Sequence, residues 1–325
     1  MKPSRLQAGD EIRVIAPSRS LAIVKGEQRR LAEERLTELG FKVTYGKTVL
    51  FHDDFFSNSI EDRIEDLHDA FRDPNVKGIF TSIGGYNANQ LLRYIDYDLI
   101  KENPKVLMGY SDITAILLAI YNKTGLTTYS GPHFSTFGMK AGLEYTMDYF
   151  KKAVVIESED FYLEPSETWS DDSWHLEQDD RTFHPNAGYM VIQEGEAAGT
   201  IIGGNLCTLN LLQGTEYMPS LKDSILFIED DEESHPFSFD RDLQSLLHQP
   251  GASGIKGIVI GRFQKDSGMT EYALQEIISS KKEINGIPVI ANANFGHVHP
   301  FVTVPVGSKA VMKVKNGKAT IQIHP

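Results

Sequence analysis

A serine that follows an apolar strand is the first residue of this chain that could do chemistry. Residues 106–108 form the apolar strand, and Gly-Tyr-Ser-Asp at 109–112 leads into a helix-like segment that begins at Ile113. A serine at such a turn exposes its hydroxyl beside free N–H groups of the new helix, which can stabilise an oxyanion. A second interpretation is that Ser111 or Asp112 caps the helix, because Ile113 stands where the fingerprint G-x-S-x-G requires glycine.

A catalytic serine needs a base, and the base needs an acceptor that orients it. Histidine is the usual base because its pKa lies near neutrality. His297 and His299 are the best placed histidines, since they lie in a glycine-containing loop just after a predicted strand. Glu229 is the first acidic residue after the apolar strand 225–228, and it is the candidate acceptor. The hypothesis is a serine, a histidine and a glutamate that meet in the folded chain.

The same histidine pair allows a metal site as an alternative. His297, His299 and the acidic residues 229–233 could supply imidazole and carboxylate ligands. Two histidines at this spacing are common by chance, however, and no further Cys or His has ligand-like spacing. We therefore expect neither a metal nor another cofactor. Cys207, the single cysteine, lies among apolar residues, which favours a buried structural thiol over a nucleophile.

Composition limits the class of protein. A chain of 325 residues is long for one core and favours two domains. The 32 basic and 45 acidic residues argue against a nucleic-acid partner. The polar segment 1–10 is unlike a signal peptide, and no apolar run has membrane-spanning length. With one cysteine, the chain suits a reducing compartment, so we expect a cytoplasmic protein with no membrane partner.

Strand and helix patterns alternate along the first part of the chain. This alternation predicts parallel strands joined by right-handed crossovers, with a binding crevice at their carboxyl ends. Gly84-Gly85 and Ser111 both follow such strands. The glycine pair matches no dinucleotide or P-loop fingerprint, so it is either a tight turn or a loop whose N–H approaches a substrate oxygen. The predicted strands are 11–17, 41–45, 78–83 and 106–108, and the helices are 27–39, 60–71, 90–94 and the segment from 113.

The pattern changes at about residue 157, which predicts three parts: 1–156, 157–198 and 199–325. The middle part is polar, has little periodicity and carries Trp169 and Trp174. It is either a linker held by its rings or a loop that offers stacking faces to a planar ligand. The last part is a second α/β region that ends in a hairpin around Asn316-Gly317. Its predicted strands are 200–203, 224–228, 257–261 and 288–291, and its helices are 206–212 and 272–278.

Several of these motifs resemble the LD-carboxypeptidase family of serine peptidases. They are Ile-Gly-Gly-Tyr-Asn at 83–87, Gly-Tyr-Ser-Asp at 109–112, Phe-Ile-Glu-Asp at 227–230 and Phe-Gly-His at 295–297. The resemblance covers nearly the whole chain, with the motifs in the right order. It implies an α/β fold with a flavodoxin-like, parallel-sheet N-terminal domain and a smaller, barrel-like α/β C-terminal domain, in a homodimer.

The resemblance also implies roles for individual residues. Ser111 would be the nucleophile, His297 the base and Glu229 the residue that orients it, whereas His299 becomes a neighbour. The backbone N–H groups of Gly85 and Asp112 would form the oxyanion hole. The chain would need no cofactor.

Two branches of the family differ in substrate. Residues 84–92 and the loop with two tryptophans resemble the microcin C self-immunity branch, which cleaves an amide bond in aminoacyl-nucleotide-like toxins. There Tyr86, Asn87, Trp169 and Trp174 would contact the substrate, with the indoles stacked on adenine. Ala88 departs from that branch, where serine is expected. The alternative is the murein tetrapeptide branch, which removes terminal D-alanine and has no evident use for two indoles. A metal-dependent hydrolase or a non-catalytic nucleotide-binding protein ranks below both.

Overall fold

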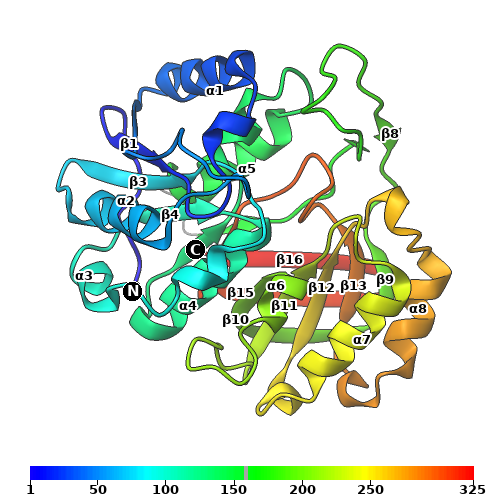
Figure 1. The fold of residues 1–325 in the computed structure, drawn as a ribbon. Helices are drawn as coiled ribbons and strands as arrows, with labels where there is room; N and C mark the ends of the chain where they lie inside the picture. Colours follow the sequence, from blue (N-terminus) through cyan, green and yellow to red (C-terminus); the bar gives the residue numbers. More distant parts are fainter. Residues whose placement is uncertain (157–159) are drawn as a thin grey trace.

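The first of two main sheets gathers the N-terminal strands. The computed structural model describes residues 1–156 and 160–325 and places the two sheets side by side (Figure 1). The strand order is β14-β5-β4-β3-β1-β2, and all neighbours are parallel except β14 and β5. The order of β1 to β5 is that of a flavodoxin-like fold, which confirms the predicted fold class. The bounds are β1 Glu11–Ile15, β2 Lys42–Tyr45, β3 Val76–Thr81, β4 Val106–Gly109, β5 Thr128–Ser130 and β14 Val304–Val306.

The second sheet has the order β6-β16-β15-β10-β11-β12-β13-β9. Strands β10 to β13 run parallel, and β15 and β16 form the predicted hairpin around Asn316-Gly317. A small separate pair consists of β7 and β8. The bounds are β6 Phe161–Tyr162, β7 Thr168–Trp169, β8 His184–Pro185, β9 Met190–Gln193, β10 Gly195–Asn205, β11 Ser224–Glu229, β12 Gly257–Gly261, β13 Val289–Ala293, β15 Lys309–Lys315 and β16 Lys318–His324.

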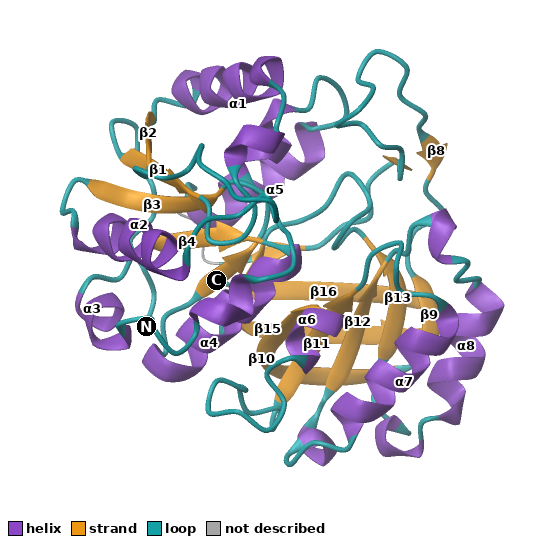
Figure 2. Ribbon diagram, viewed as in Figure 1, coloured by secondary structure: helices purple, strands orange, loops and turns teal. Residues whose placement is uncertain are grey.

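Helices cover the sheets, and in Figure 2 the short α6 and the longer α7 and α8 lie in front of the second sheet. Local capping sets several helix ends: the Ser59 hydroxyl accepts from the Asp62 N–H at 3.1 Å at the start of α2, and Gly125 ends α4. In the described part of the chain no helix is long and apolar enough to cross a membrane. The bounds are α1 Gly26–Glu38, α2 Ile60–Arg72, α3 Tyr97–Glu102, α4 Thr114–Thr124, α5 Glu144–Val154, α6 Leu206–Asn210, α7 Pro236–Leu247 and α8 Glu271–Ser280.

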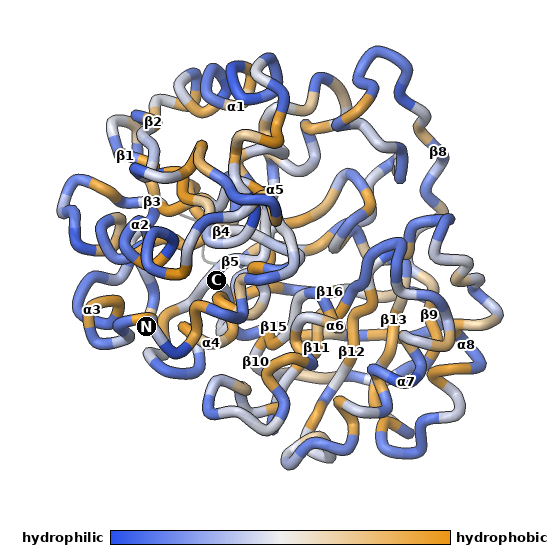
Figure 3. Tube along the Cα trace, in the orientation of Figure 1, coloured by the Kyte–Doolittle hydropathy of each residue, from blue (hydrophilic) through white to orange (hydrophobic). Residues whose placement is uncertain are grey.

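Helix α4 packs between the two sheets. Most of its residues are buried, because its sequence is apolar around nearly the whole circumference. At its start the Thr114 hydroxyl accepts a hydrogen bond from the Asn205 N–H of β10 at 3.0 Å. Buried side chains from both sheets also share one cluster, which includes Met108 of β4 and Phe227 of β11. Figure 3 shows the contrast between hydrophobic β12 inside and mostly hydrophilic α1 outside. The two sheets therefore share a continuous apolar core.

The chain crosses between the sheets more often than the predicted domains indicate. Strand β9 and the first residues of β10 lie in the segment 157–198, so the predicted boundary after residue 198 falls inside β10. Strand β14 lies in the segment 199–325 but pairs with β5 of the first sheet. The predicted boundary between residues 156 and 157 adjoins residues 157–159, which lie outside the described part.

A buried aromatic residue of β11 tests this shared core. Phe227 is 1% exposed and packs edge-to-face against Phe295, with ring centroids 5.8 Å apart. We expect Phe227→Ala to lower the free energy of unfolding by about 3–5 kcal/mol, because truncation leaves a cavity. Phe237→Ala is the matched control, since Phe237 is 88% exposed. It should change the free energy by less than about 0.5 kcal/mol in urea unfolding. Equal losses in the two variants would contradict a core that includes β11.

Candidate active site

Ser111 sits on a strained turn at the carboxyl end of β4. Its φ is +60°, a left-handed conformation that costs a non-glycine residue about 1–3 kcal/mol. A short 3₁₀ turn, Ser111–Ile113, then leads into α4. Neither Ser111 nor Asp112 makes a capping hydrogen bond to the new helix, so the capping interpretation of the sequence is wrong.

The structure brings together the serine, the histidine and the glutamate that the sequence singled out. Ser111 Oγ lies 3.1 Å from His297 Nε2, and His297 Nδ1 lies 2.7 Å from Glu229 Oε2. Glu229 ends β11, and His297 lies in the loop after β13. Gly296 has a φ of +101°, and a Cβ there would lie 2.3 Å from Glu229 Oε2, so a side chain at residue 296 would displace the carboxylate. The three groups form one hydrogen-bonded chain.

The charge of Glu229 controls the histidine. Glu229 is 2% exposed, and its carboxylate has His297 as its neighbour. Burial alone lowers the pKa of His297, but the Glu229 carboxylate, with smaller contributions from Asp231 and Asp230, outweighs burial and raises this pKa to about 9. The imidazole of His297 therefore holds a proton at neutral pH and becomes neutral only near pH 9 and above.

A buried carboxylate fastens the glycine loop to the Ser111 turn. Asp112, 3% exposed, accepts from the Ser18 hydroxyl at 2.5 Å and from the Ala88 N–H at 2.9 Å. A Cβ on Gly84 would lie 2.9 Å from Ser111 Oγ, so only glycine allows this approach. The Gly85 N–H donates to no acceptor in the described part of the chain, and Gly85, Ser111 and Asp112 line one pocket. This N–H is available to an oxyanion.

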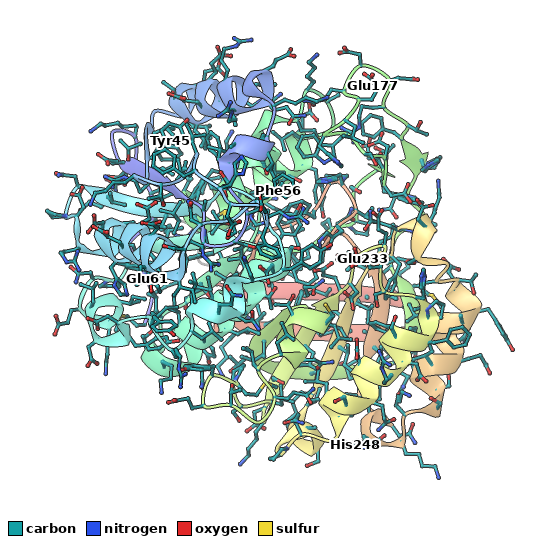
Figure 4. The ribbon with its side chains drawn as sticks, viewed as in Figure 1. Tyr45, Phe56, Glu61, Glu177, Glu233 and His248 are labelled. Atoms are coloured by element: carbon teal, nitrogen blue, oxygen red, sulfur yellow. The ribbon has the colours of Figure 1, made fainter. Side chains whose placement is uncertain are left out.

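The four residues expected to contact substrate lie in different surroundings. Tyr86, 65% exposed, lines the pockets around Ser111, and its hydroxyl donates to Glu233 Oε1 at 2.9 Å. Figure 4 shows Glu233 near the centre of this view, and it is exposed on the loop after β11. The Asn87 side chain instead accepts from Arg63 Nη1 at 3.1 Å, and Asn87 lines a separate pocket behind Tyr86.

The two tryptophans do not form a pair. Trp174 is 8% exposed and lines a pocket together with His297. Its Nε1–H donates to His299 Nε2 at 3.0 Å. Trp169 does not line the pockets that contain Ser111 or His297, and the cationic groups of Arg262 and Lys265 lie 4.8 and 5.0 Å from its ring centroid. Of the two tryptophans, Trp174 is the one that lines the pocket with His297.

His299 is buried and hydrogen-bonded to a neighbouring side chain. Its Nε2 already accepts from Trp174, and burial lowers its pKa to about 3. Among residues 1–156 and 160–325, no group of three or more His, Cys, Asp or Glu side chains is arranged to hold a metal ion. In these residues, His297 and His299 therefore do not belong to a set of ligands that could hold a metal.

The sequence analysis missed two residues beside Ser111. His133 lies behind Tyr110, with ring centroids 4.4 Å apart, and burial lowers its pKa to about 3. Arg19 lies over the Tyr86 ring, 4.9 Å from its centroid. Both residues come soon after the carboxyl end of a strand. The same position after a strand identified Ser111 in the sequence. The expectation for Cys207 was wrong, because this thiol is exposed and lines the pocket with Ser111.

Comparison with known families identifies the fold. The family model of the LD-carboxypeptidase N-terminal domain matches residues 12–131, and that of the LD-carboxypeptidase C-terminal domain matches residues 198–312. Together the matches cover most of the chain. The chain belongs to the LD-carboxypeptidase family of serine peptidases, as the motifs predicted.

Individual relatives include proteins named for carboxypeptidase activity and for microcin C7 self-immunity. YocD of Bacillus subtilis (strain 168), provisionally named a carboxypeptidase, is 53% identical over 99% of both chains. The microcin C7 self-immunity protein MccF of Escherichia coli is 31% identical over 97% of this chain and 94% of its own. The crystal structure of an MccF-like protein from Bacillus anthracis str. Ames has a TM-score of 0.98 and 56% identity over 99% of both chains. A structure of MccF in complex with glutamyl sulfamoyl guanosine has a TM-score of 0.87 and 30% identity, over 99% of this chain and 98% of its own.

The pairing of Glu229 with His297 predicts how the pKa of His297 changes when Glu229 is replaced. Because Glu229 is the main cause that raises the pKa of His297 to about 9, Glu229→Gln should lower it toward its ordinary 6.5 or below, where only the smaller contributions of Asp231 and Asp230 oppose burial. Nuclear magnetic resonance of the imidazole protons measures this pKa. Glu232→Gln, which neutralises an exposed acid of the same loop, should leave it near 9. A pKa that is unchanged in Glu229→Gln would contradict the electrostatic role of Glu229.

Proposed function

We propose that this protein is a serine hydrolase that cleaves an amide bond in aminoacyl-nucleotide-like compounds, with Ser111, His297 and Glu229 as its catalytic triad. The observation that carries the proposal is the continuous contact from Ser111 Oγ through His297 to Glu229, at 3.1 and 2.7 Å. These distances suit proton transfer from the hydroxyl to the imidazole.

The mechanism follows from the positions of the groups. His297 Nε2 takes the Ser111 proton as Oγ attacks the scissile carbonyl, and Glu229 stabilises the imidazolium. The N–H groups of Gly85 and Asp112 donate hydrogen bonds to the oxyanion, each contributing a factor of about 10²–10³ in rate. His297 then protonates the leaving nitrogen, and water hydrolyses the acyl-enzyme. Because the base must be neutral, kcat/KM should rise with pH to about 9.

A nucleotide-like leaving group is supported on the His297 side of the cleft. Trp174 and Tyr86 line this pocket, and aromatic faces stack on bases. The related MccF has been crystallised with glutamyl sulfamoyl guanosine and with aspartyl sulfamoyl adenosine. We include Trp174 and Tyr86 in the substrate site; the contacts of Asn87 and Trp169 offer less support for such a role.

Arg19 is compatible with a second candidate, the removal of terminal D-alanine from a murein tetrapeptide. Its guanidinium lies over Tyr86 and lines the pockets that contain His297. Arginine binds carboxylates through paired hydrogen bonds, so it could hold the carboxylate of a leaving amino acid. It could equally bind the sulfamoyl or phosphate group of a nucleotide.

Mass spectrometry separates these candidates. The intact protein should cleave glutamyl sulfamoyl adenosine, and Ser111→Ala should be slower by at least about 10³-fold because it lacks the nucleophile. Thr303→Ser serves as the control for a buried hydroxyl residue outside the triad and should retain activity. Loss of D-alanine from a murein tetrapeptide, without cleavage of the adenosine compound, would support the second candidate. Cleavage that persists in Ser111→Ala would overturn the serine mechanism.

A further inference from the structure

The cleft extends from Ser111 in two directions. One direction contains His297, Arg19 and Trp174. The other contains Ser111 but not His297 and is lined by α6, the loop after β11 and α7. We call the second direction the α6–α7 pocket. Besides Asp112, its acidic side chains are Asp230, Asp231, Glu233 and Asp242, and Asp231 and Glu233 also reach the His297 side.

Positive charge does not balance these acids. The described residues that line the α6–α7 pocket include no lysine or arginine. Arg241 Nε lies 3.9 Å from Asp242 Oδ1, but its side chain is 80% exposed, and such surface pairs are weak. The electrostatic potential in the pocket is therefore negative.

Two buried polar atoms in the pocket lack hydrogen bonds. Asp230 is 2% exposed, and its Oδ1 accepts from Asn205 Nδ2 at 3.1 Å and from the Asp231 N–H at 3.2 Å. Asp230 Oδ2 and the hydroxyl of Ser234, which is 6% exposed, have no well-aligned hydrogen-bond partner in the described part of the chain, although the nearby Ser234 hydroxyl favours the charged form of Asp230. Burial, with Glu229 and Asp231 nearby, raises the pKa of Asp230 to about 7. A buried carboxylate oxygen without a donor is costly, and an ammonium group would supply both the donor and the opposite charge.

The position of His297 assigns the pocket to one part of the substrate. His297 must protonate the leaving group, so the leaving group lies on the side that contains His297. The acyl part then extends the other way from Ser111. That direction is the α6–α7 pocket, which also contains the Gly85 and Asp112 loops.

We propose that the α6–α7 pocket binds an ammonium group on the acyl part of the substrate, with Asp230 as the main acceptor. The enzyme then prefers acyl groups that carry a positive charge, either on a lysine-like side chain or on the α-amino group. This assignment to the acyl part rests on the proposed function, because the role of His297 sets the direction of the substrate.

Cys207 allows a test of the pocket that needs no activity. It is the single cysteine of the chain, it is exposed, and it lines the pocket. A trimethylammonium methanethiosulfonate should modify it about 10-fold faster than the sulfonate analogue, after correction for their rates with a free thiol. Asp230→Asn should reduce this ratio, and Asp98→Asn, which changes an exposed acid on α3, should not. Equal rates for the two reagents would overturn the proposal.

Substrate pairs test the preference directly. We expect kcat/KM for lysyl sulfamoyl adenosine to exceed that for the neutral norleucyl analogue by about 10-fold, the scale of one ion pair in a pocket. Acetylation of the α-amino group in both compounds shows which ammonium is recognised. Asp230→Asn, and independently Asp242→Asn, should lower the rate with the lysyl compound more than with the norleucyl compound. Equal loss with both compounds would indicate structural damage and contradict recognition of charge.

The outcomes separate the two proposals. Cleavage of both compounds without a preference for any ammonium overturns the pocket assignment and leaves the proposed function intact. If the adenosine compounds are stable but acetyl-lysyl-D-alanine is cleaved, the proposed function fails. The comparison with acetyl-norleucyl-D-alanine then decides the pocket assignment. If no compound is cleaved, the relative modification rates of Cys207 alone test whether the α6–α7 pocket attracts a cation.

Discussion

The site depends on one negative charge at the end of an apolar strand. All residues of β11 are buried, and the strand ends in Glu229. An isolated carboxylate in such a place costs several kcal/mol, and His297 compensates for it with a charge-assisted hydrogen bond. Space for this pair comes from Gly261 and Gly296, because a Cβ on either would lie within 2.7 Å of a Glu229 side-chain atom. The need to neutralise Glu229 thus positions the imidazole, and the imidazole in turn faces Ser111.

Contact between the two sheets brings these groups to hydrogen-bond distance. Ser111 comes from the first sheet and Glu229 from the second, and the Thr114–Asn205 hydrogen bond joins the two beside the site. Gly204 packs directly on Thr114, since a Cβ there would lie 2.5 Å from the threonine hydroxyl oxygen. Close packing of this kind limits movement between α4 and β10. The strained backbone of Ser111 is maintained by the same packing.

The sequence predicted the elements with strong periodicity and their order, but not all of their neighbours. The strand ends that carry Ser111, Glu229 and His297 were recognisable because glycine or acidic residues follow apolar runs. Strand β14 was not, because Pro305 suggests a loop, although proline is tolerated at a sheet edge. Cys207 was expected to be buried because its neighbours are apolar, but α6 has only five residues and exposes one face. The local sequence does not show that Ser111, His297 and Glu229 meet. It also does not show that Trp169 and Trp174 lie in separate surroundings, since both features depend on long-range packing.

The pairing of β14 with β5 has a consequence for the order of synthesis. The loop that carries His297 begins after β13 in the second sheet and ends at β14 in the first. Until residue 306 has left the ribosome, β5 keeps an unpaired edge and the loop has no second anchor. A nascent chain can therefore form the Ser111 turn early, but it positions His297 only when nearly all of the polypeptide has been made. An unfinished chain therefore lacks the contact between His297 and Ser111, because the pairing of β14 with β5 comes late in the sequence.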